Sequence, residues 1–265
     1  MSFDLKDVHV ILVGYKKTVN QYFVNLDLYR HNFSFGKDLW ITTVYNDDLN
    51  ACPSGIGENT WIHAKDGGYA TGALYTINEG LEFAYHFNRD IVLIHNFDVL
   101  FFTEDGFKRC IQEFISSNKI FSAAIDCNQL PATDCMLFKR EALDRLAPIP
   151  QYHQGYREQL EIAERYKDTQ LGFKNMEEWV FSSLVNYCSD KFNRNPGDSP
   201  EEIDHYIKNY MKEMIWFPMS RFDLPRLYWS EELTLGHCHD LAIIKEKLNK
   251  YQVKNGNFVK QLVGS

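Results

Sequence analysis

The sequence predicts an α/β protein built on a mostly parallel β-sheet that is covered by helices. Two observations support this prediction. Strand-like and helix-like segments alternate through the first hundred residues, as they do where crossover helices join parallel strands. Residues 91–94 (Ile-Val-Leu-Ile) form an unbroken, β-prone apolar run, which is typical of a strand buried on both faces.

The first half of the chain supplies the alternating elements. Strands are expected at residues 8–13, 38–45 and 60–64, and a further strand, the buried one, within 90–100. Residues 19–31 carry apolar side chains at helical spacing and predict a helix, with Thr18 as its N-cap. Residues 69–87 predict a longer helix that leads into the buried strand.

The second half has a less regular pattern. Strands are expected at residues 120–125 and 135–139, and a strand or turn at 231–239. Helices are expected at residues 107–117, from 139 to just before Pro148, and at 156–166, 177–187, 200–214 and 240–250. No linker or internal repeat interrupts the chain, so we expect a single domain over residues 1–265.

Composition limits the partners and the compartment. The formal net charge of −8 argues against a nucleic-acid partner but leaves a small phosphorylated ligand open. No apolar run reaches the roughly 18 residues of a membrane span, so no transmembrane segment is expected. The N-terminus lacks the pattern of a signal peptide, and the six cysteines are scattered without a Cys-x-x-Cys pair. We therefore expect a cytoplasmic protein.

Three polar side chains, His95, Asn96 and Asp98, come directly after the buried strand. A carboxylate at the end of such a strand needs solvent, hydrogen bonds or a cation. In open α/β sheets, ligands bind just beyond the carboxyl ends of the strands. Asp98 is therefore predicted to hold a metal or a polar substrate. The alternative is a turn aspartate that caps the next segment.

Other strand ends carry short motifs in a recognisable order. Residues 13–18 (Val-Gly-Tyr-Lys-Lys-Thr) close the first strand, and 45–48 (Tyr-Asn-Asp-Asp) close the second. Residues 66–68 (Asp-Gly-Gly) form an expected turn before the long helix, and 96–98 (Asn-Phe-Asp) follow the buried strand. This order resembles the GT-A glycosyltransferases, most closely the family 2-like branch, from about residue 8 to 187.

The resemblance implies a GT-A, Rossmann-like sheet with a C-terminal helical and irregular extension. Residues 1–105 would form the nucleotide-sugar-binding half, and 106–265 the acceptor-side half and the extension. The partners would be a UDP- or GDP-sugar and a glycan or other hydroxyl acceptor. The implied donor-binding residues are Gly14, Tyr15, Thr18, Asn46, Asp47, Gly67, Gly68 and Asn96.

The family's Asp-x-Asp metal motif is incomplete here, because Asn96 stands where the first aspartate would be. Paired carboxylates in this motif hold a divalent cation that neutralises the departing diphosphate. Mg²⁺ or Mn²⁺ can be held by a single carboxylate and substrate phosphates, so Asp98 could suffice, assisted by the Asn96 oxygen or a His95 nitrogen. The alternative is that metal binding has been lost.

The C-terminal segment Gly236-His237-Cys238-His239-Asp240 adds two further metal candidates. Some GT-A enzymes add a C-terminal histidine to the metal or the diphosphate. His237 and His239 would project to the same side of an extended strand, so both could reach one site. Alternatively, both are hydrogen-bonded in a packed turn.

Two further segments resemble the acceptor side of the family. Asp134, before a strand that leads into a helix, could contact an acceptor hydroxyl, or it could be a turn residue at a strand edge. Glu177 and Glu178 open the helix at 177–187, where inverting enzymes carry their base. Glu178 is the better base candidate and Glu177 the second, with Trp179 as an apolar wall on the acceptor side. Glutamates are also favoured in a first helical turn by the helix dipole alone.

These observations predict a metal-dependent, inverting glycosyltransferase, with retention of configuration left open. One alternative is a nucleotidyltransferase, although residues 14–17 make a poor phosphate loop. The other is a non-catalytic protein that binds a nucleotide sugar or a glycan, and the missing first aspartate is its best support.

Overall fold

The computed structural model of the chain describes residues 5–47, 54–64, 68–87, 89–117, 120–125, 131–146, 215–218, 220–221 and 228–264. The strands in these ranges are β1 (Val8–Gly14), β2 (Trp40–Tyr45), β3 (Thr60–His63), β4 (Ile91–Asn96), β5 (Val99–Phe101), β6 (Phe121–Ile125), β7 (Pro131–Lys139), β8 (Ile215–Pro218), β9 (Ser220–Arg221), β10 (Tyr228–Ser230) and β11 (Leu235–His237). The α-helices are α1 (Val19–Asp27), α2 (Gly68–Phe87), α3 (Glu104–Ser116), α4 (Arg140–Leu146), α8 (Leu241–Lys250) and α9 (Asn257–Gly264).

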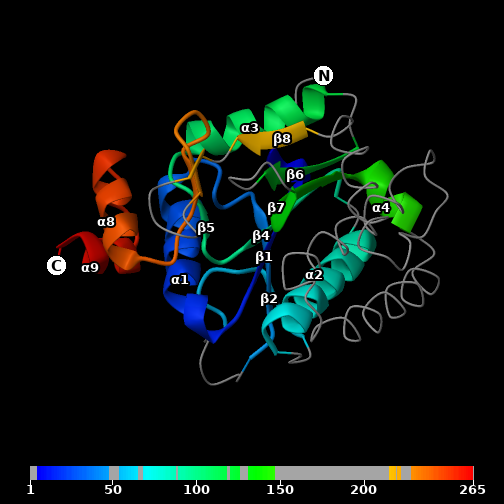
Figure 1. The fold of residues 1–265 in the computed structure, drawn as a ribbon, viewed down its shortest axis with the longest axis horizontal. Coiled ribbons are helices and arrows are strands. Elements are labelled where there is room, and N and C mark those ends of the chain that lie inside the picture. The colour runs from blue at the N-terminus through cyan, green and yellow to red at the C-terminus, as the bar shows by residue number, and fades with distance from the viewer. Residues whose placement is uncertain are drawn as a thin grey trace.

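The larger sheet confirms the predicted fold class. Its strand order is β3-β2-β1-β4-β7-β6-β8 among the described residues. Strands β3, β2, β1 and β4 are mutually parallel, and β8 is parallel to β6. Only β7 runs against its neighbours β4 and β6 in this described sheet. The chain therefore forms a mixed α/β structure around a mostly parallel sheet (Figure 1).

The order of the parallel strands creates a switch point. From β1 the chain first adds β2 and then β3 on one side, and it then crosses to place β4 on the other side of β1. Crossovers that leave one strand in opposite directions open a crevice at the carboxyl ends of the two central strands. The end of β4, which is followed by Asp98, lies at this crevice.

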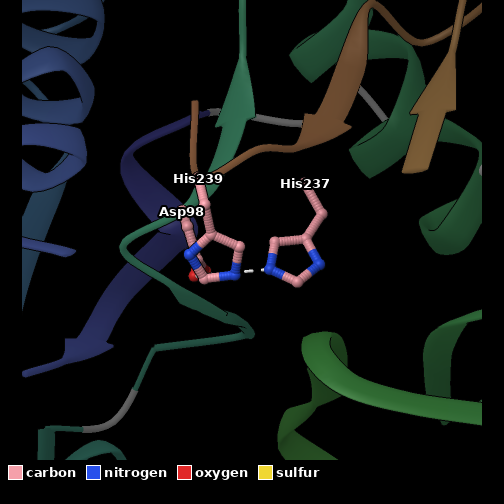
Figure 2. Close-up of side chains that lie close together, drawn as sticks. All are labelled: Asp98, His237 and His239. Atoms are coloured by element: carbon pink, nitrogen blue, oxygen red, sulfur yellow. Dashed lines mark ion pairs between the residues drawn. The ribbon is translucent and has the colours of Figure 1, made fainter. Parts of the chain in front are cut away.

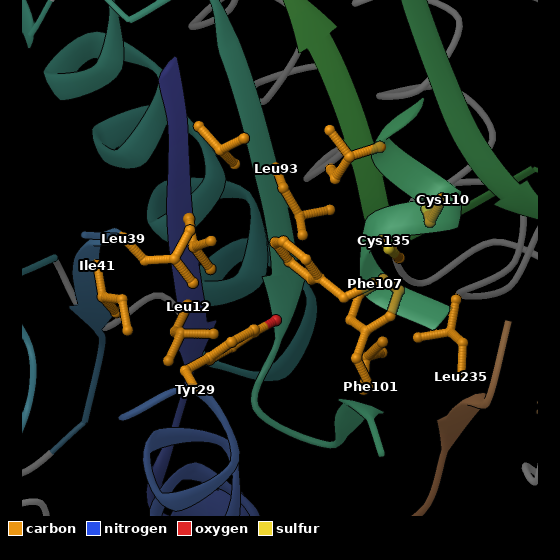
Figure 3. Packing of buried hydrophobic residues seen from close by; sticks show 14 of the residues in the cluster. Leu12, Tyr29, Leu39, Ile41, Leu93, Phe101, Phe107, Cys110, Cys135 and Leu235 are labelled. Atoms are coloured by element: carbon orange, nitrogen blue, oxygen red, sulfur yellow. The ribbon is translucent and has the colours of Figure 1, made fainter. Parts of the chain in front are cut away.

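Helices cover both faces of the parallel strands (Figure 1). Side chains of β1 and β4 alternate between the two faces because successive residues of a strand point in opposite directions. On one face, Leu12 and Leu93 join Tyr29 of the segment after α1 in the main apolar cluster (Figure 3). On the other face, Ile11 and Ile94 pack on Gly80 of α2, where an added Cβ would lie 2.8 Å from Ile11.

A second, smaller sheet brings the C-terminal segment to the end of β4. Its described strands have the order β5-β11-β10-β9. Two residues separate β5 from β4. Strand β5 pairs antiparallel with β11 in a register that places Val99 opposite His237. The backbone N–H of Cys238 also donates to the carbonyl of Asp98 over 2.8 Å. This pairing joins positions 98 and 237, which are far apart in the sequence.

Several details differ from the sequence-based expectations. Thr18 is the N-cap residue of α1, as predicted, but its hydroxyl donates to the carbonyl of Tyr15 and accepts no hydrogen bond from the helix. The first helix ends at Asp27 and continues as a π-helical turn over Leu28–Asn32. Helix α9 was not expected. The helices expected at 156–166, 177–187 and 200–214 lie outside the described residues.

None of the helices in the described ranges is both long enough and apolar enough to cross a membrane.

Candidate metal and donor site

Three side chains that the sequence proposed as metal ligands meet at the end of β4. The Nε2 atoms of His237 and His239 each lie 3.3 Å from Oδ2 of Asp98 (Figure 2). One ligand atom from each of these residues lies within 4.8 Å of the others. The expectation that both histidines reach one site with Asp98 therefore agrees with the geometry.

Asp98 is the most buried residue of this cluster. Its side chain is 5% exposed and that of His237 10%, whereas that of His239 is 39% exposed. The second oxygen of Asp98, Oδ1, is buried and has no hydrogen-bond partner among the described residues. Buried polar atoms are usually paired, so an orphaned carboxylate oxygen beside two imidazoles fits a site that binds a cation. The cluster is exposed to solvent on the side of His239.

Charge at the cluster favours the ionised form of Asp98. Burial raises the pKa of the Asp98 carboxyl, but the charge and hydrogen bond of His237, with a further contribution from His239, lower it more. The pKa of Asp98 consequently lies below its ordinary value. The site thus holds an anionic oxygen in a nearly closed environment, which is the ligand type that hard divalent cations prefer.

His237 is also held from its other side. Its Nδ1 atom lies 3.6 Å from Oδ2 of Asp134, which is an ion-pair distance. The remaining oxygen of Asp134 accepts a 2.6 Å hydrogen bond from Nδ2 of Asn96. This distance is longer than that of a hydrogen bond, so the contact between Asp134 and His237 is electrostatic. Asp134, which the sequence suggested as an acceptor contact, therefore lies against the imidazole of His237.

His95 does not lie among the ligand atoms of the cluster. The His95 ring is buried, and its Nε2 and Nδ1 atoms are hydrogen-bonded to the Tyr29 hydroxyl at 2.7 Å and to the Asn96 carbonyl at 2.9 Å. Burial lowers the pKa of His95 to about 4, so the ring is neutral at neutral pH. Because both of its nitrogens are engaged in the core, His95 is not available to a metal, contrary to the suggestion from the sequence.

The proposed donor residues of β1 and β2 meet beside this cluster. The backbone N–H of Asn46 donates to the carbonyl of Gly14 over 3.3 Å, and the N–H of Phe97 donates to the carbonyl of Val13 over 2.8 Å. Asp47 accepts a long hydrogen bond, 3.4 Å, from the N–H of Lys16. The carboxyl ends of β1, β2 and β4 thus form one continuous rim.

Two of the proposed donor residues have roles within the fold. The ring of Phe97 lies where a Cβ on Gly14 would be, with atoms 2.3–2.8 Å away, so packing alone requires glycine at this position. Thr18 is buried, and its hydroxyl is used inside the turn that precedes α1. Gly14 therefore has a packing role, and the Thr18 hydroxyl is already used within the fold.

Of the remaining proposed site residues, some lie in the described part of the chain and others do not. Gly68 is the first residue of α2 rather than part of a turn before it. Gly67 lies outside the described residues, and so do the proposed catalytic residues Glu177 and Glu178 and the acceptor-side Trp179. Tyr15 follows β1 at the rim, where its carbonyl accepts from the N–H of Thr18 over 3.0 Å.

Two amide side chains of α1 support the cluster and were not singled out from the sequence. Nδ2 of Asn25 donates to the carbonyls of Phe97 and Val99, which flank Asp98, over 2.7 and 3.1 Å. Nε2 of Gln21 donates to the carbonyl of His239 over 2.9 Å. These residues are one helical turn apart and buried. The signal in the sequence that could have revealed them is the spacing of four residues, which places both amides on one face of the predicted helix.

Comparisons with known proteins find likeness only among solved structures. No protein-family model matches the chain, and no curated protein matches it. The chain is similar to the galactosyltransferase LgtC, in complex with donor and acceptor sugar analogues, with 14% identity and a TM-score of 0.45 over 97% of this chain and 99% of that chain.

Two other glycosyltransferases show a similar degree of likeness. GlyE from Streptococcus pneumoniae TIGR4 has 14% identity and a TM-score of 0.43, covering 97% of this chain and 62% of GlyE. The mannosyltransferase PcManGT from Pyrobaculum calidifontis, in complex with GDP-Man and Mn²⁺, has 16% identity and a TM-score of 0.37, covering 53% of this chain. The chain spans only 46% of PcManGT and 62% of GlyE. Because these TM-scores are below 0.5, the likeness does not decide what this chain does.

Proposed function

We propose that this protein is a metal-dependent glycosyltransferase that moves a sugar from a UDP- or GDP-sugar to a hydroxyl acceptor. The observation that supports this most is the cluster of Asp98, His237 and His239 at the switch point of the parallel sheet. Ligands of open α/β sheets bind at such a point. A cation there would lie beside the rim formed by the ends of β1 and β2.

Different residues around the cluster would bind different parts of the nucleotide sugar. Asp98, His237 and His239 would hold the cation, and a diphosphate would approach on the side of His239, the more exposed of these residues. The bound cation would neutralise the negative charge of the diphosphate leaving group. Tyr15, Asn46 and Asp47 on the neighbouring rim would contact the nucleoside, with Gly67 and Gly68 on the far side of the donor.

The proposed base for the acceptor lies outside the described residues. A hydroxyl is a weak nucleophile until a positioned carboxylate takes its proton in the transition state. Glu178 would take this proton, with Glu177 as the second candidate and Trp179 beside the acceptor. The acceptor oxygen would bond to the anomeric carbon as the bond to the diphosphate oxygen breaks, which inverts the configuration at that carbon.

A nucleotide panel tests the proposal directly. Calorimetric titration with UDP, GDP and CDP, with and without Mn²⁺, should show one preferred nucleotide whose binding requires the metal. The corresponding nucleotide sugar should then be hydrolysed slowly, or transferred when an acceptor is present. Glu178→Gln should retain donor binding and lose transfer. If none of the nucleotides binds with any divalent metal, the proposal is wrong.

A second candidate, a binding protein without transferase activity, is favoured by one observation. Asn96 replaces an acid at the rim and donates to Asp134, so Asp98 is the one carboxylate of the described metal cluster. Such a protein would bind the nucleotide sugar but would neither hydrolyse nor transfer it, and Glu178→Gln would change nothing that can be measured.

A further inference from the structure

The carboxyl end of β3 adds a histidine to the rim formed by β1 and β2. The register of β2 and β3 places His63 opposite Tyr45, and the N–H of Ala64 donates to the carbonyl of Tyr45 over 2.8 Å. The two parallel strands therefore end side by side. His63, which has no role in the metal cluster, is exposed at this edge of the sheet, next to the residues that follow β2.

The ring of His63 is bonded to the segment that leaves β2. Its Nε2 atom lies 3.0 Å from the carbonyl oxygen of Asp47, and the side chain of Asp47 accepts from the N–H of Lys16 over 3.4 Å. A carbonyl oxygen can only accept a hydrogen bond, so Nε2 carries the proton of the neutral ring. The other nitrogen, Nδ1, is then an acceptor, and it has no hydrogen-bond partner among the described residues.

Two hydrogen-bond acceptors consequently occupy neighbouring positions of the rim. One is the carboxylate of Asp47, and the other is Nδ1 of His63. Proteins read an unpaired nucleobase through hydrogen bonds along its edge, and an acceptor is satisfied only by a donor on the base. A pair of acceptors therefore favours a base whose edge carries two adjacent donors.

The bases of common nucleotide sugars differ in the donors that they present. Guanine carries an N1–H beside an exocyclic N2 amino group, so two donors lie next to each other on one edge. Uracil carries one N3–H between two carbonyl oxygens, and a pair of acceptors would bring one of these oxygens against another acceptor. In cytosine the amino group lies beside a ring nitrogen that accepts. Guanine is thus the base of these three that matches the rim.

We propose that His63 reads the base of the donor together with Asp47, and that this pair selects guanine, which makes the donor a GDP-sugar. Asp47 would accept from N1–H, and Nδ1 of His63 would accept from the N2 amino group. The inference rests on the proposed function for the binding of a nucleotide at this rim, and it adds the base and a residue that distinguishes it. One hydrogen bond of this kind changes affinity by about 5-fold.

Inosine diphosphate (IDP) isolates the contribution of His63, because hypoxanthine keeps the N1–H of guanine but lacks the N2 amino group. The full chain is titrated calorimetrically with GDP, IDP and UDP in the presence of Mn²⁺. The key variant is His63→Ala. The control is His86→Ala, the same change at an exposed histidine near the end of α2, which leads to the opposite edge of the sheet.

The unaltered protein and His86→Ala should bind GDP more tightly than UDP, and about 5-fold more tightly than IDP. In His63→Ala alone, the ratio of GDP to IDP affinity should fall to about 1.

Three results would show that the inference about His63 is wrong while the proposed function stands. The first is tighter binding of UDP than of GDP by the unaltered protein, and the second is equal binding of GDP and IDP. The third is an unchanged ratio of GDP to IDP affinity in His63→Ala, because His63 would then only support the turn at Asp47. If no nucleotide binds at all, the proposed function fails as well.

Discussion

Asp98 combines three properties: it is buried, its pKa is lowered, and one of its oxygens has no hydrogen-bond partner among the described residues. A buried carboxylate without cations nearby would have a raised pKa. The two histidines reverse that direction here, because their charge stabilises the anion. A divalent cation between the same groups would act on Asp98 in the same way.

The contact between Asp134 and His237 leads to a prediction about metal affinity. Asp134→Asn keeps the shape of the side chain but removes the charge that faces His237. We expect Mn²⁺ affinity to fall by roughly 10-fold or more, because loss of a carboxylate that orients a metal-binding histidine costs about that much. Calorimetry measures the affinity. Asp38→Asn, an exposed position before β2, is the control and should bind Mn²⁺ normally. Equal affinities in both variants would remove Asp134 from the site.

Gly14 gives a prediction about stability rather than binding. In Gly14→Ala, the new methyl group would collide with the buried Phe97 ring, which is packed 4.7 Å from the ring of Tyr22. We expect the free energy of unfolding to fall by about 1–3 kcal/mol, the usual cost of overpacking a core. Urea unfolding measures the change. Gly264→Ala, where a Cβ meets no atom within 4 Å, should change stability little. Similar stabilities for the two variants would contradict the packing explanation.

Helix α1 is the element that joins the two halves of the metal cluster. One buried face of the helix presents Gln21 to the carbonyl of His239 and Asn25 to the carbonyls on both sides of Asp98. The end of the same helix holds the C-terminus, because the carboxylate of Asp27 accepts from the N–H of Val259 in α9. The helix therefore fixes the distance between segments that the chain places far apart.

Asn25→Ala tests this role of the helix. The variant leaves two backbone carbonyls without their donor, which should lower the free energy of unfolding by about 1–3 kcal/mol. We also expect weaker Mn²⁺ binding, because the turn that carries Asp98 loses its support. Unfolding and calorimetric titrations of the same samples check both effects. Asn20→Ala changes an exposed residue of the same helix and should alter neither quantity. Normal Mn²⁺ affinity in a destabilised Asn25→Ala would show that the helix stabilises the fold only.

The sequence predicts long, periodic elements better than short ones. The strand at residues 8–13 and the helix at 69–87 match β1 and α2 within one residue, because apolar runs and helical spacing extend over many positions. Strands β5 and β11 have three residues each, too few for a period to be recognised, and their pairing depends on tertiary contact. The antiparallel direction of β7 leaves no mark on the sequence of the strand itself.

The same contrast applies to the candidate site. Asp98, His237 and His239 could be proposed from the sequence, because a carboxylate after a buried strand and a His-x-His pair are local signals. The contact of Asp134 with His237 and the use of both His95 nitrogens in the core could not, because each depends on pairing between distant strands.

At the scale of the whole molecule, buried neutral histidines make the fold sensitive to acid. His9 is buried, its Nε2 lies 2.8 Å from the Thr42 hydroxyl, and burial, with a smaller effect of the charge on Arg89, lowers its pKa to about 3. Its ordinary pKa is 6.5. Between these values the unfolded chain binds a proton that the folded chain does not, so the free energy of unfolding falls as the pH drops from about 6.5 towards 3. His95, with a pKa of about 4, acts in the same direction.

The corresponding prediction concerns the slope of stability against pH. In His9→Gln, the free energy of unfolding should depend less steeply on pH between about 6 and 4 than in the unaltered protein, whatever its absolute value. Urea unfolding at a series of pH values measures the slope. His86→Gln replaces an exposed histidine and should keep the original slope. If His9→Gln also keeps it, His9 binds its proton equally in the folded and unfolded chains.

The central claim is that Asp98 lies at the switch point between β1 and β4 and binds a metal there. The effect of Mn²⁺ on nucleotide affinity tests this claim most directly. The measurement is calorimetric titration of UDP and GDP, with and without Mn²⁺, on the unaltered protein, on Asp98→Asn and on the exposed control Asp105→Asn. We predict that Mn²⁺ strengthens binding of one nucleotide by at least about 10-fold in the unaltered protein and in Asp105→Asn, and that Asp98→Asn abolishes this gain. An equal gain from Mn²⁺ in Asp98→Asn would contradict the account.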